Sequence, residues 1–239
     1  MHHTTLIVPG LHGSGPEHWQ SWLERQLPDA RRVPEIDWER PVLARWANAV
    51  RDAIDRSPGL VWVVAHSFGC LASVVASADR AHRVAGLMLV APADPERFTP
   101  HGLRNADAHP DQDSLARWIP RDPLDPPSLV VASTNDPWVR LSSAAYWADC
   151  WGSHLEEIGP AGHINVESGH GPWARGLELL QRLQAAGNDL PLGAIDDPKL
   201  TRRGRHGALA RLRHRTRSDA LLSDEAGGSR TAAYRSRLR

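Results

Sequence analysis

Short, almost wholly apolar runs alternate along the chain with longer segments that carry apolar residues at helical spacing. Apolar runs of about four to eight residues are typical of buried strands, and apolar residues three and four positions apart predict amphipathic helices. Residues 92–121 are polar and rich in proline, so we expect a long loop there, with a short helix near 115–119. The predicted strands are 4–8, 33–36, 60–64, 84–91, 128–132 and 154–158, and the predicted helices are 16–28, 41–56, 71–81, 142–151 and 172–186.

This alternation predicts one doubly wound α/β domain with a mostly parallel sheet of about six strands. Pro34 cannot donate a backbone hydrogen bond, so the strand at 33–36 is expected at an edge of the sheet. In such sheets a ligand binds in the crevice outside the carboxyl ends of the strands. The residues that directly follow each predicted strand are therefore the first candidates for a functional site.

The strand at 60–64 runs into the turn Ala65-His-Ser-Phe-Gly69, which leads directly into a predicted helix. A serine on such a turn is exposed at the sheet edge, with backbone N–H groups directed at a developing oxyanion. Compared with the nucleophile elbow G-x-S-x-G, Ala65 replaces the first glycine and Gly69 keeps the second. A second interpretation of Ser67 is an N-cap of the following helix.

Two further predicted strands end at polar residues with a chemical role. The strand at 128–132 leads to Asp136, and the strand at 154–158 leads to His163. Serine, aspartate and histidine thus follow one another in the chain order of the α/β-hydrolases. Because parallel strands end at the same edge of a sheet, we expect the three side chains to converge.

Hydrolysis by a serine requires these residue types, because a hydroxyl is a weak nucleophile until an imidazole takes its proton. We predict Ser67 as the nucleophile, His163 as the general base and Asp136 as the carboxylate that orients the imidazole. The predicted oxyanion donors are two backbone N–H groups, those of Phe68 and of Leu11. Leu11 lies in a glycine-rich turn after the first strand, together with the supporting residue Gly10.

Other interpretations of these residues stay open at this point. Asp136 precedes Pro137 and could only initiate a turn, and His163 could be an ordinary loop histidine. A metal site built on His163 and His170 would need ligands that no close-spaced motif supplies, so we predict no metal and no cofactor. The histidines expected near the site or on the surface are His12, His18, His66 and His170, and the tryptophans that could line a pocket are Trp19 and Trp138.

Cysteine usage and hydropathy restrict the compartment. Cys70 and Cys150 lie far apart without a CxxC pattern, so neither a disulfide framework nor a zinc cage is predicted. No run approaches the roughly 18 apolar residues of a membrane span, and the first five residues lack the basic region of a signal peptide. We therefore expect a soluble, cytoplasmic protein without membrane association.

Four motifs together resemble the family of retinoblastoma-binding protein nine and bacterial YdeN. They are Val8-Pro-Gly-Leu-His-Gly-Ser-Gly-Pro-Glu-His-Trp19, Ala65-His-Ser-Phe-Gly69, Ser133-Thr-Asn-Asp-Pro137 and Gly159-Pro-Ala-Gly-His-Ile-Asn-Val-Glu-Ser-Gly169. The resemblance covers residues 4 to about 186. It implies a small α/β-hydrolase with little or no lid, in which Ser67, Asp136 and His163 form a catalytic triad, and alanine at position 65 agrees with the family.

The sequence therefore predicts a serine hydrolase that acts on a small ester, with an amide or thioester ranked below it. The expected partner is a small acyl substrate. Because a fold alone never proves chemistry, two alternatives remain, a non-catalytic scaffold that binds a protein partner and an acyltransferase.

The hydrolase domain is predicted at residues 1–187, and residues 188–239 form a basic tail that we expect to be disordered. From position 188 onward the chain carries 12 basic and 6 acidic residues. Arginine clusters bind phosphates, so a contact of the tail with nucleic acid or a membrane surface stays open. We rank that contact below disorder, beside the alternative that the tail is a spurious extension of the reading frame.

Overall fold

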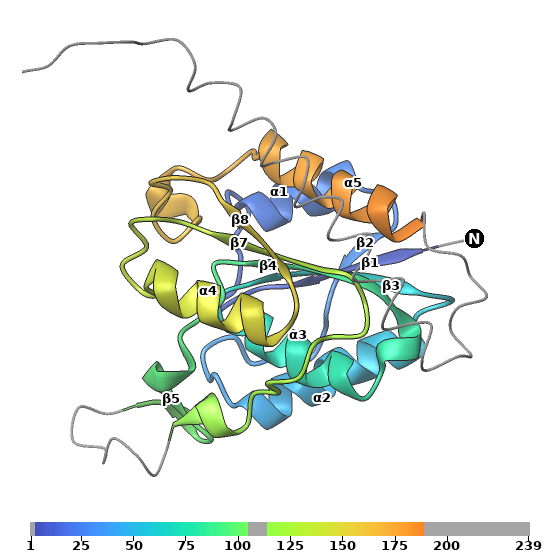
Figure 1. Cartoon of the computed structure of the whole chain (residues 1–239). Coiled ribbons are helices and arrows are strands. Elements are labelled where there is room, and N and C mark those ends of the chain that lie inside the picture. Colours follow the sequence, from blue (N-terminus) through green and yellow to red (C-terminus); the bar gives the residue numbers. More distant parts are fainter. Residues whose placement is uncertain (1–2, 105–113, 189–239) are drawn as a thin grey trace, which may run out of the picture.

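Six parallel strands form the central sheet of the computed structural model, which describes residues 3–104 and 114–188 (Figure 1). The strand order is β2-β1-β3-β4-β7-β8, and every neighbouring pair is parallel. The predicted fold class is confirmed. The strands are β1 (Thr4–Val8), β2 (Ala30–Arg32), β3 (Val61–His66), β4 (Val84–Val90), β7 (Ser128–Ala132) and β8 (His154–Glu157).

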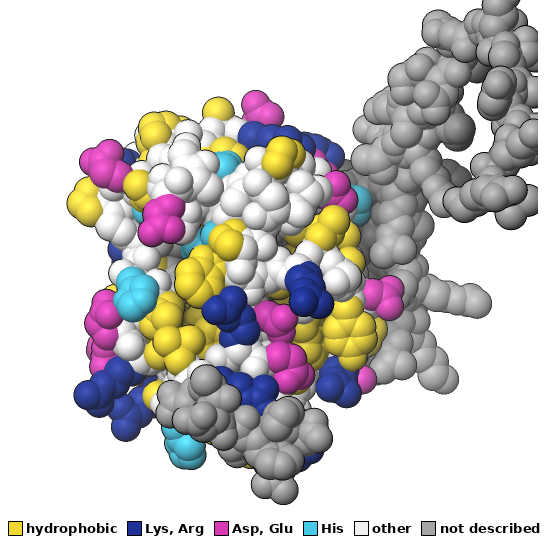
Figure 2. All heavy atoms as spheres, turned by 90° about the vertical axis from the view of Figure 1, so that its left-hand side faces the viewer, with side chains coloured by type: hydrophobic (Ala, Val, Ile, Leu, Met, Phe, Trp, Pro, Cys, Tyr) yellow, Lys and Arg dark blue, Asp and Glu magenta, His cyan; other side chains and the backbone are white. Residues whose placement is uncertain are grey.

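Five helices cover the two faces of the sheet. Helices α1 and α5 pack on one face, whereas α2, α3 and α4 pack on the other (Figure 1). The helices are α1 (Trp19–Gln26), α2 (Leu43–Arg56), α3 (Phe68–Ala78), α4 (Leu141–Cys150) and α5 (Ala174–Asn188). All strands end on the left-hand side of Figure 1, which is the side that Figure 2 views.

Strand β3 shows why nearly every residue of a central strand is apolar. Its side chains alternate between the two faces, so Val61, Val63 and Ala65 enter the core under α2 and α3. Trp62 and Val64 enter the core under α1 and α5. Because helices cover both faces of the sheet, no side chain of β3 faces solvent, and polar residues are not needed. This packing holds β3 rigidly and so positions the residues that follow it.

The predicted strand at 33–36 is wrong, because the chain pairs with β1 earlier, through Ala30, Arg31 and Arg32. An edge strand can carry arginine, since its side chains reach polar partners. The Arg32 guanidinium donates to the carbonyl of Ser14 at 2.7 Å and to Glu24. The expected edge position itself holds, because β2 is the outermost strand.

The predicted loop at 92–121 contains more regular structure than expected. It holds a 3-10 helix η2 (Pro95–Arg97) and a short antiparallel hairpin of β5 (Phe98–Thr99) with β6 (Gly102–Leu103). The predicted short helix at 115–119 is present as the 3-10 helix η3 (Leu115–Arg117). Residues 105–113 lie outside the described part, so the expectation of little or no lid stays a prediction.

The predicted basic tail also lies outside the described residues, apart from Asn188 at the end of α5. The division of the chain into a domain at 1–187 and a tail at 188–239 therefore stays a prediction. In the described ranges, no helix is long and apolar enough to cross a membrane.

Candidate active site

Ser67 sits at the junction of β3 and α3 in a backbone conformation that few non-glycine residues adopt, with φ 51° and ψ −122°. Such strain of about 1–3 kcal/mol persists only where surrounding contacts hold the residue in place. Here the N–H of Ser67 donates to the carbonyl of Val90 at 3.0 Å, and the carbonyl of Ser67 accepts from Cys70 and Ala93. The serine hydroxyl makes no capping hydrogen bond. Ser67 thus occupies the N-cap position of α3 but does not cap the helix with its side chain.

The small residues around Ser67 are required by close backbone contacts. A Cβ atom on Gly69 would lie 2.4 Å from the carbonyl oxygen of Pro9, and one on Gly10 would lie 2.7 Å from the Cβ of Ser67. Ala65 is fully buried, and its methyl group fits into the core beneath α3. The elbow therefore accepts alanine at its first small position but has no room for it at position 69.

His163 links the serine to the aspartate. Its Nε2 lies 3.0 Å from the Ser67 hydroxyl and its Nδ1 lies 2.8 Å from Oδ2 of Asp136. The side chain of Asp136 is 1% exposed and that of His163 is 10% exposed. The structure therefore brings together the three residues that the sequence singles out, in a largely water-excluded chain of hydrogen bonds.

Asp136 also initiates the turn that its position before proline suggests. Its Oδ1 accepts hydrogen bonds from the N–H groups of Trp138 and Val139 at 2.8 and 3.3 Å. The other carboxylate oxygen, Oδ2, faces His163. The turn is thus present on one oxygen, and the other oxygen is placed to orient the imidazole, although the catalytic role of Asp136 stays a prediction.

The loops that carry Asp136 and His163 are tied to each other by residues that sequence reasoning missed. The amide oxygen of Asn135 accepts from the N–H of Gly162 at 2.7 Å, and the hydroxyl of Ser133 accepts from the N–H of Ala161 at 2.9 Å. The only signal in the sequence was their presence in the motif Ser133-Thr-Asn-Asp-Pro137. These bonds fix the separation of the acid and the base.

His66 lies directly behind His163. Its side chain is buried, its Nε2 lies 2.9 Å from the carbonyl oxygen of His163, and the two rings are 4.9 Å apart. Burial lowers the pKa of His66 well below the usual value, and the neighbouring His163 and His18 lower it further. A neutral imidazole that faces a carbonyl oxygen must carry its proton on that nitrogen, so His66 donates to the backbone of His163.

The other candidate histidines lie around this pair. His18 is buried at the start of α1, where burial followed by the charge of Arg32 lowers its pKa to about 4. His12 is exposed and pairs with Glu39 at 2.8 Å. Burial also lowers the pKa of the half-buried His170. In the described part of the chain no group of three or more His, Cys, Asp or Glu side chains is arranged to hold a metal ion.

The predicted oxyanion donors flank Ser67. Leu11 directly follows Gly10, where an added Cβ atom would lie 2.7 Å from the Cβ of Ser67, and Phe68 is the first residue of α3. The first N–H groups of a helix have no partner within it, and neither Phe68 nor Leu11 donates its N–H to an acceptor among the described residues. Their role as donors to an oxyanion beside Ser67 stays a prediction.

Gln20 anchors the glycine-rich turn from below, and sequence reasoning missed it. Its fully buried side-chain amide donates to the carbonyls of Val8 and Val64 at 3.2 and 3.1 Å, and its oxygen accepts from the hydroxyl of Ser14 at 2.7 Å. It thereby joins the ends of β1 and β3 to the turn. A polar residue on the inner face of an amphipathic helix was the available signal.

Of the two tryptophans considered for a pocket, only Trp138 lies at an open position. Trp19 is 1% exposed and its indole N–H donates to the carbonyl of Ile164 at 2.8 Å, so it supports the His163 loop from within the core. The Trp138 side chain is 50% exposed, with its ring 6.5 Å from that of His163. Figure 2 shows hydrophobic, histidine and charged side chains together on this face.

Two comparisons with known proteins indicate the same family. Residues 5–182 match the family described as serine hydrolase. A protein of Pectobacterium atrosepticum described as a YdeN-like hydrolase is 38% identical with a TM-score of 0.67, and the match covers 77% of this chain and 92% of that one. No match was found among the curated proteins.

More distant structures share the fold. The YdeN product of Bacillus subtilis is 18% identical with a TM-score of 0.58, and the match covers 77% of this chain and all of that one. Est1E of Butyrivibrio proteoclasticus, solved with ferulic acid, is 18% identical with a TM-score of 0.55, and the match covers 76% of this chain and 86% of that one. The predicted likeness to retinoblastoma-binding protein nine stays a prediction. From the matched family and the 38% identical relative, we conclude that the chain belongs to the serine hydrolases and is a YdeN-family α/β-hydrolase.

Proposed function

We propose that this protein hydrolyses a small ester through an acyl intermediate on Ser67, with amides and thioesters as poorer substrates. The observation that carries the proposal is the continuous chain of hydrogen bonds from Asp136 through His163 to Ser67. Two structural neighbours support it, Est1E and esterase 2 of Thermogutta terrifontis, which is 14% identical with a TM-score of 0.56. The cytoplasmic location expected from the two unpaired cysteines belongs to the same proposal.

In the first half of the reaction the Ser67 oxygen attacks the carbonyl carbon of the ester as His163 Nε2 takes the hydroxyl proton. Asp136 stabilises the imidazolium that forms through the bond to Nδ1. The tetrahedral oxyanion accepts hydrogen bonds from the N–H groups of Phe68 and Leu11. Collapse expels the alcohol, which receives the proton from Nε2, and leaves the acyl group on Ser67.

In the second half a water molecule takes the place of the alcohol. His163 removes one of its protons, the resulting hydroxide attacks the acyl carbon, and a second tetrahedral intermediate forms in the same oxyanion site. Its collapse releases the carboxylic acid and returns the proton to the Ser67 oxygen. All of these steps use groups of the chain and one water molecule.

Covalent labelling with a fluorophosphonate probe, followed by peptide mapping, tests the proposal. Wild-type protein should be labelled on Ser67, and Ser67→Ala should not be labelled. Asp136→Asn and His163→Ala should react about 100-fold more slowly or worse, because positioned general-base catalysis contributes at least that much. Ser142→Ala, at an exposed position of α4, is the matched control and should label like wild type.

A folded wild-type protein that resists the probe would contradict this proposal. In that case the non-catalytic scaffold that binds a protein partner becomes the better hypothesis. Rapid labelling combined with faster product formation when alcohols or amines are added would instead point to acyl transfer, because the acyl group on Ser67 would then pass to acceptors other than water.

A further inference from the structure

A guanidinium group lies over the aromatic ring at the open edge of the site. The Cζ atom of Arg97 is 4.5 Å from the centre of the Trp138 ring, and Nη1 donates to the carbonyl oxygen of Trp138 at 3.3 Å. Stacking fixes the plane of a guanidinium and the backbone bond fixes its rotation. Arg97 is therefore held in place over Trp138, whose ring lies 6.5 Å from that of His163.

The remaining N–H groups of Arg97 have no carboxylate partner in the described part of the chain. The two acidic residues described next to Arg97, Asp94 and Glu96, have other partners. Asp94 accepts from the N–H of Glu96 at 3.1 Å, and the carboxylate of Glu96 lies 3.9 Å from Arg104. An exposed guanidinium that is fixed by an aromatic ring but not neutralised offers a ready position for an anion.

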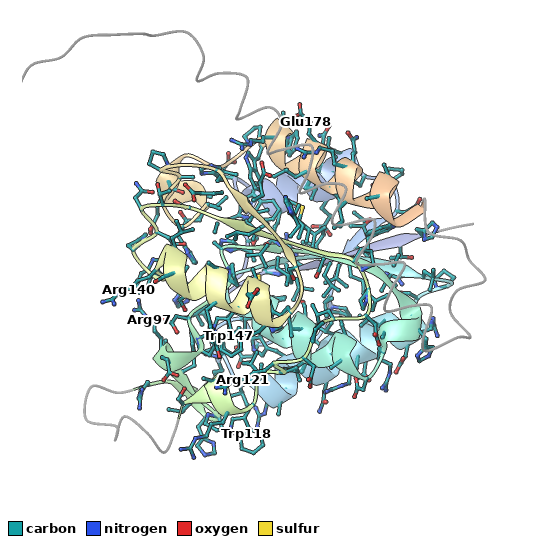
Figure 3. All side chains as sticks on the ribbon, in the orientation of Figure 1. Arg97, Trp118, Arg121, Arg140, Trp147 and Glu178 are labelled. Atoms are coloured by element: carbon teal, nitrogen blue, oxygen red, sulfur yellow. The ribbon has the colours of Figure 1, made fainter. Side chains whose placement is uncertain are left out.

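A second arginine strengthens the positive charge at this edge. Arg140 directly precedes α4 and is exposed, and among residues 3–104 and 114–188 it has no ion-pair partner. Figure 3 places Arg97 and Arg140 on the side of the molecule where the strands end. The two residues come from the segments after β4 and after β7 respectively, so two separate loops bring cations to the same edge.

A second arginine–tryptophan pair differs from the first because its tryptophan is buried and lies away from His163. Arg121 lies with its Cζ atom 6.0 Å from the centre of the Trp147 ring. Trp147 is buried in the core, 4% exposed, and no ring contact links it to His163. The Arg121 pair therefore serves as an internal comparison with the same chemistry but without access to Ser67.

We propose that Arg97, held over Trp138, binds a carboxylate group of the substrate, so that the preferred ester carries a carboxylate on its acyl chain. The proposal rests on the proposed esterase function and specifies its substrate class. A guanidinium with one N–H group already used can still offer two parallel donors, which match the two oxygens of a carboxylate. The half-exposed Trp138 ring contacts the apolar links between this carboxylate and the ester group.

The test compares two esters of the same acyl length, mono-4-nitrophenyl glutarate and its neutral counterpart, 4-nitrophenyl methyl glutarate, with each rate corrected for spontaneous hydrolysis without protein, because the free carboxylate can also attack its own ester. Wild-type kcat/KM should favour the free acid. In Arg97→Gln the ratio of the two kcat/KM values should fall about tenfold or more, mainly through KM, as expected for loss of a charged hydrogen bond. In wild type the ratio should also decrease as salt is added, because salt screens exposed charges.

Arg121→Gln is the matched control and should leave the ratio unchanged. A ratio that favours the neutral ester in wild type, or one that Arg97→Gln leaves intact, would overturn the proposal. An equal loss on both esters would do so as well, because Arg97 would then only support the loop.

A binding experiment without turnover separates this proposal from the esterase function. Saturation-transfer NMR on Ser67→Ala should detect monomethyl glutarate but not dimethyl glutarate, and the signal should vanish in Ser67→Ala with Arg97→Gln. Equal signals from the two compounds would refute carboxylate recognition whatever the labelling of Ser67 shows. Failure of labelling combined with the expected NMR result would refute only the esterase function.

Discussion

At the scale of single residues, His66 is the group whose effect on the site is least visible from sequence. It donates to the backbone carbonyl of His163, and its ring lies tilted against the His163 ring, with 4.9 Å between the ring centres. Its burial keeps it uncharged, because the folded pKa lies far below the usual value. A charged ring at this place would repel the imidazolium that the proposed mechanism forms on His163, so we propose His66 as a positioning residue.

Replacing His66 with phenylalanine keeps a ring but removes the donor. The carbonyl of His163 then loses its buried partner, which costs about 1–3 kcal/mol. We expect kcat to fall about tenfold or more with KM within twofold. His66→Gln, which retains a side-chain N–H donor, should recover much of kcat. Steady-state kinetics with a nitrophenyl ester measures both values.

The control for this experiment is His82→Phe, at an exposed position of η1. It should leave kcat unchanged. If His66→Gln were as slow as His66→Phe while both unfolded at the wild-type urea concentration, the hydrogen bond would not be what positions His163.

At the scale of elements, the crossing of α3 over the end of β1 determines the elbow. Gly69 in the first turn of α3 lies against the carbonyls of Val8 and Pro9, with 2.5 and 2.4 Å available to a Cβ atom. Those carbonyls are backbone atoms at the end of a central strand and cannot rotate away. Any side chain at position 69 must push α3 off the sheet and move Ser67 with it.

Gly69→Ala should therefore lower the free energy of unfolding by about 1–3 kcal/mol, the usual cost of overpacking, and should slow fluorophosphonate labelling. Gly15→Ala is the matched control, because nothing lies within 4 Å of a Cβ atom there. Urea unfolding and labelling rates measure the two effects. Gly69→Ala with a wild-type labelling rate would show that the contact is not required for the elbow.

The apolar pattern of the sequence predicts the bounds of some strands but not of others. The bounds of β1 and β7 follow from apolar runs alone, because a strand covered on both faces needs an uninterrupted apolar sequence. Strand β2 breaks that pattern because its partners are side chains elsewhere in the chain, and the β5–β6 hairpin is too short to show an alternation.

The candidate site follows the same rule. Ser67, Asp136 and His163 could be predicted because each lies in the turn or loop that follows a recognisable strand. Gln20 and Asn135 could not, because their partners are backbone atoms that only the folded chain brings near. Local pattern identifies the reacting groups, whereas the groups that hold them depend on tertiary contacts.

At the scale of the whole molecule, the buried histidines make stability depend on pH. His18 has a pKa of about 4 when folded and an ordinary value near 6.5 when unfolded. Between these values the unfolded chain binds more protons, so acid favours unfolding and stability is regained as pH rises. As the pH falls through this range, the pKa difference of His18 alone lowers the free energy of unfolding by about 3 kcal/mol. The lowered pKa of His66 acts in the same direction.

We expect the free energy of unfolding in urea to fall steeply between pH 6.5 and pH 4. His18→Asn keeps a side-chain acceptor for the N–H of Gln20 at the start of α1 but cannot bind a proton. It should flatten the dependence, whereas His82→Asn should not. The same steep dependence in His18→Asn as in wild type would assign acid unfolding to other groups.

The two carboxylate oxygens of Asp136 have separate roles, one in the fold and one in the proposed reaction. Oδ1 closes a turn after β7, and Oδ2 alone faces His163. Asparagine keeps the first oxygen and replaces the second with an amide nitrogen, which donates where the imidazole also donates. We therefore expect exchange of this single atom to leave the fold intact while the proposed reaction slows about 100-fold or more. A single substitution could therefore convert a hydrolase of this fold into a protein that only binds its ligand. The fold of that protein would not show the change.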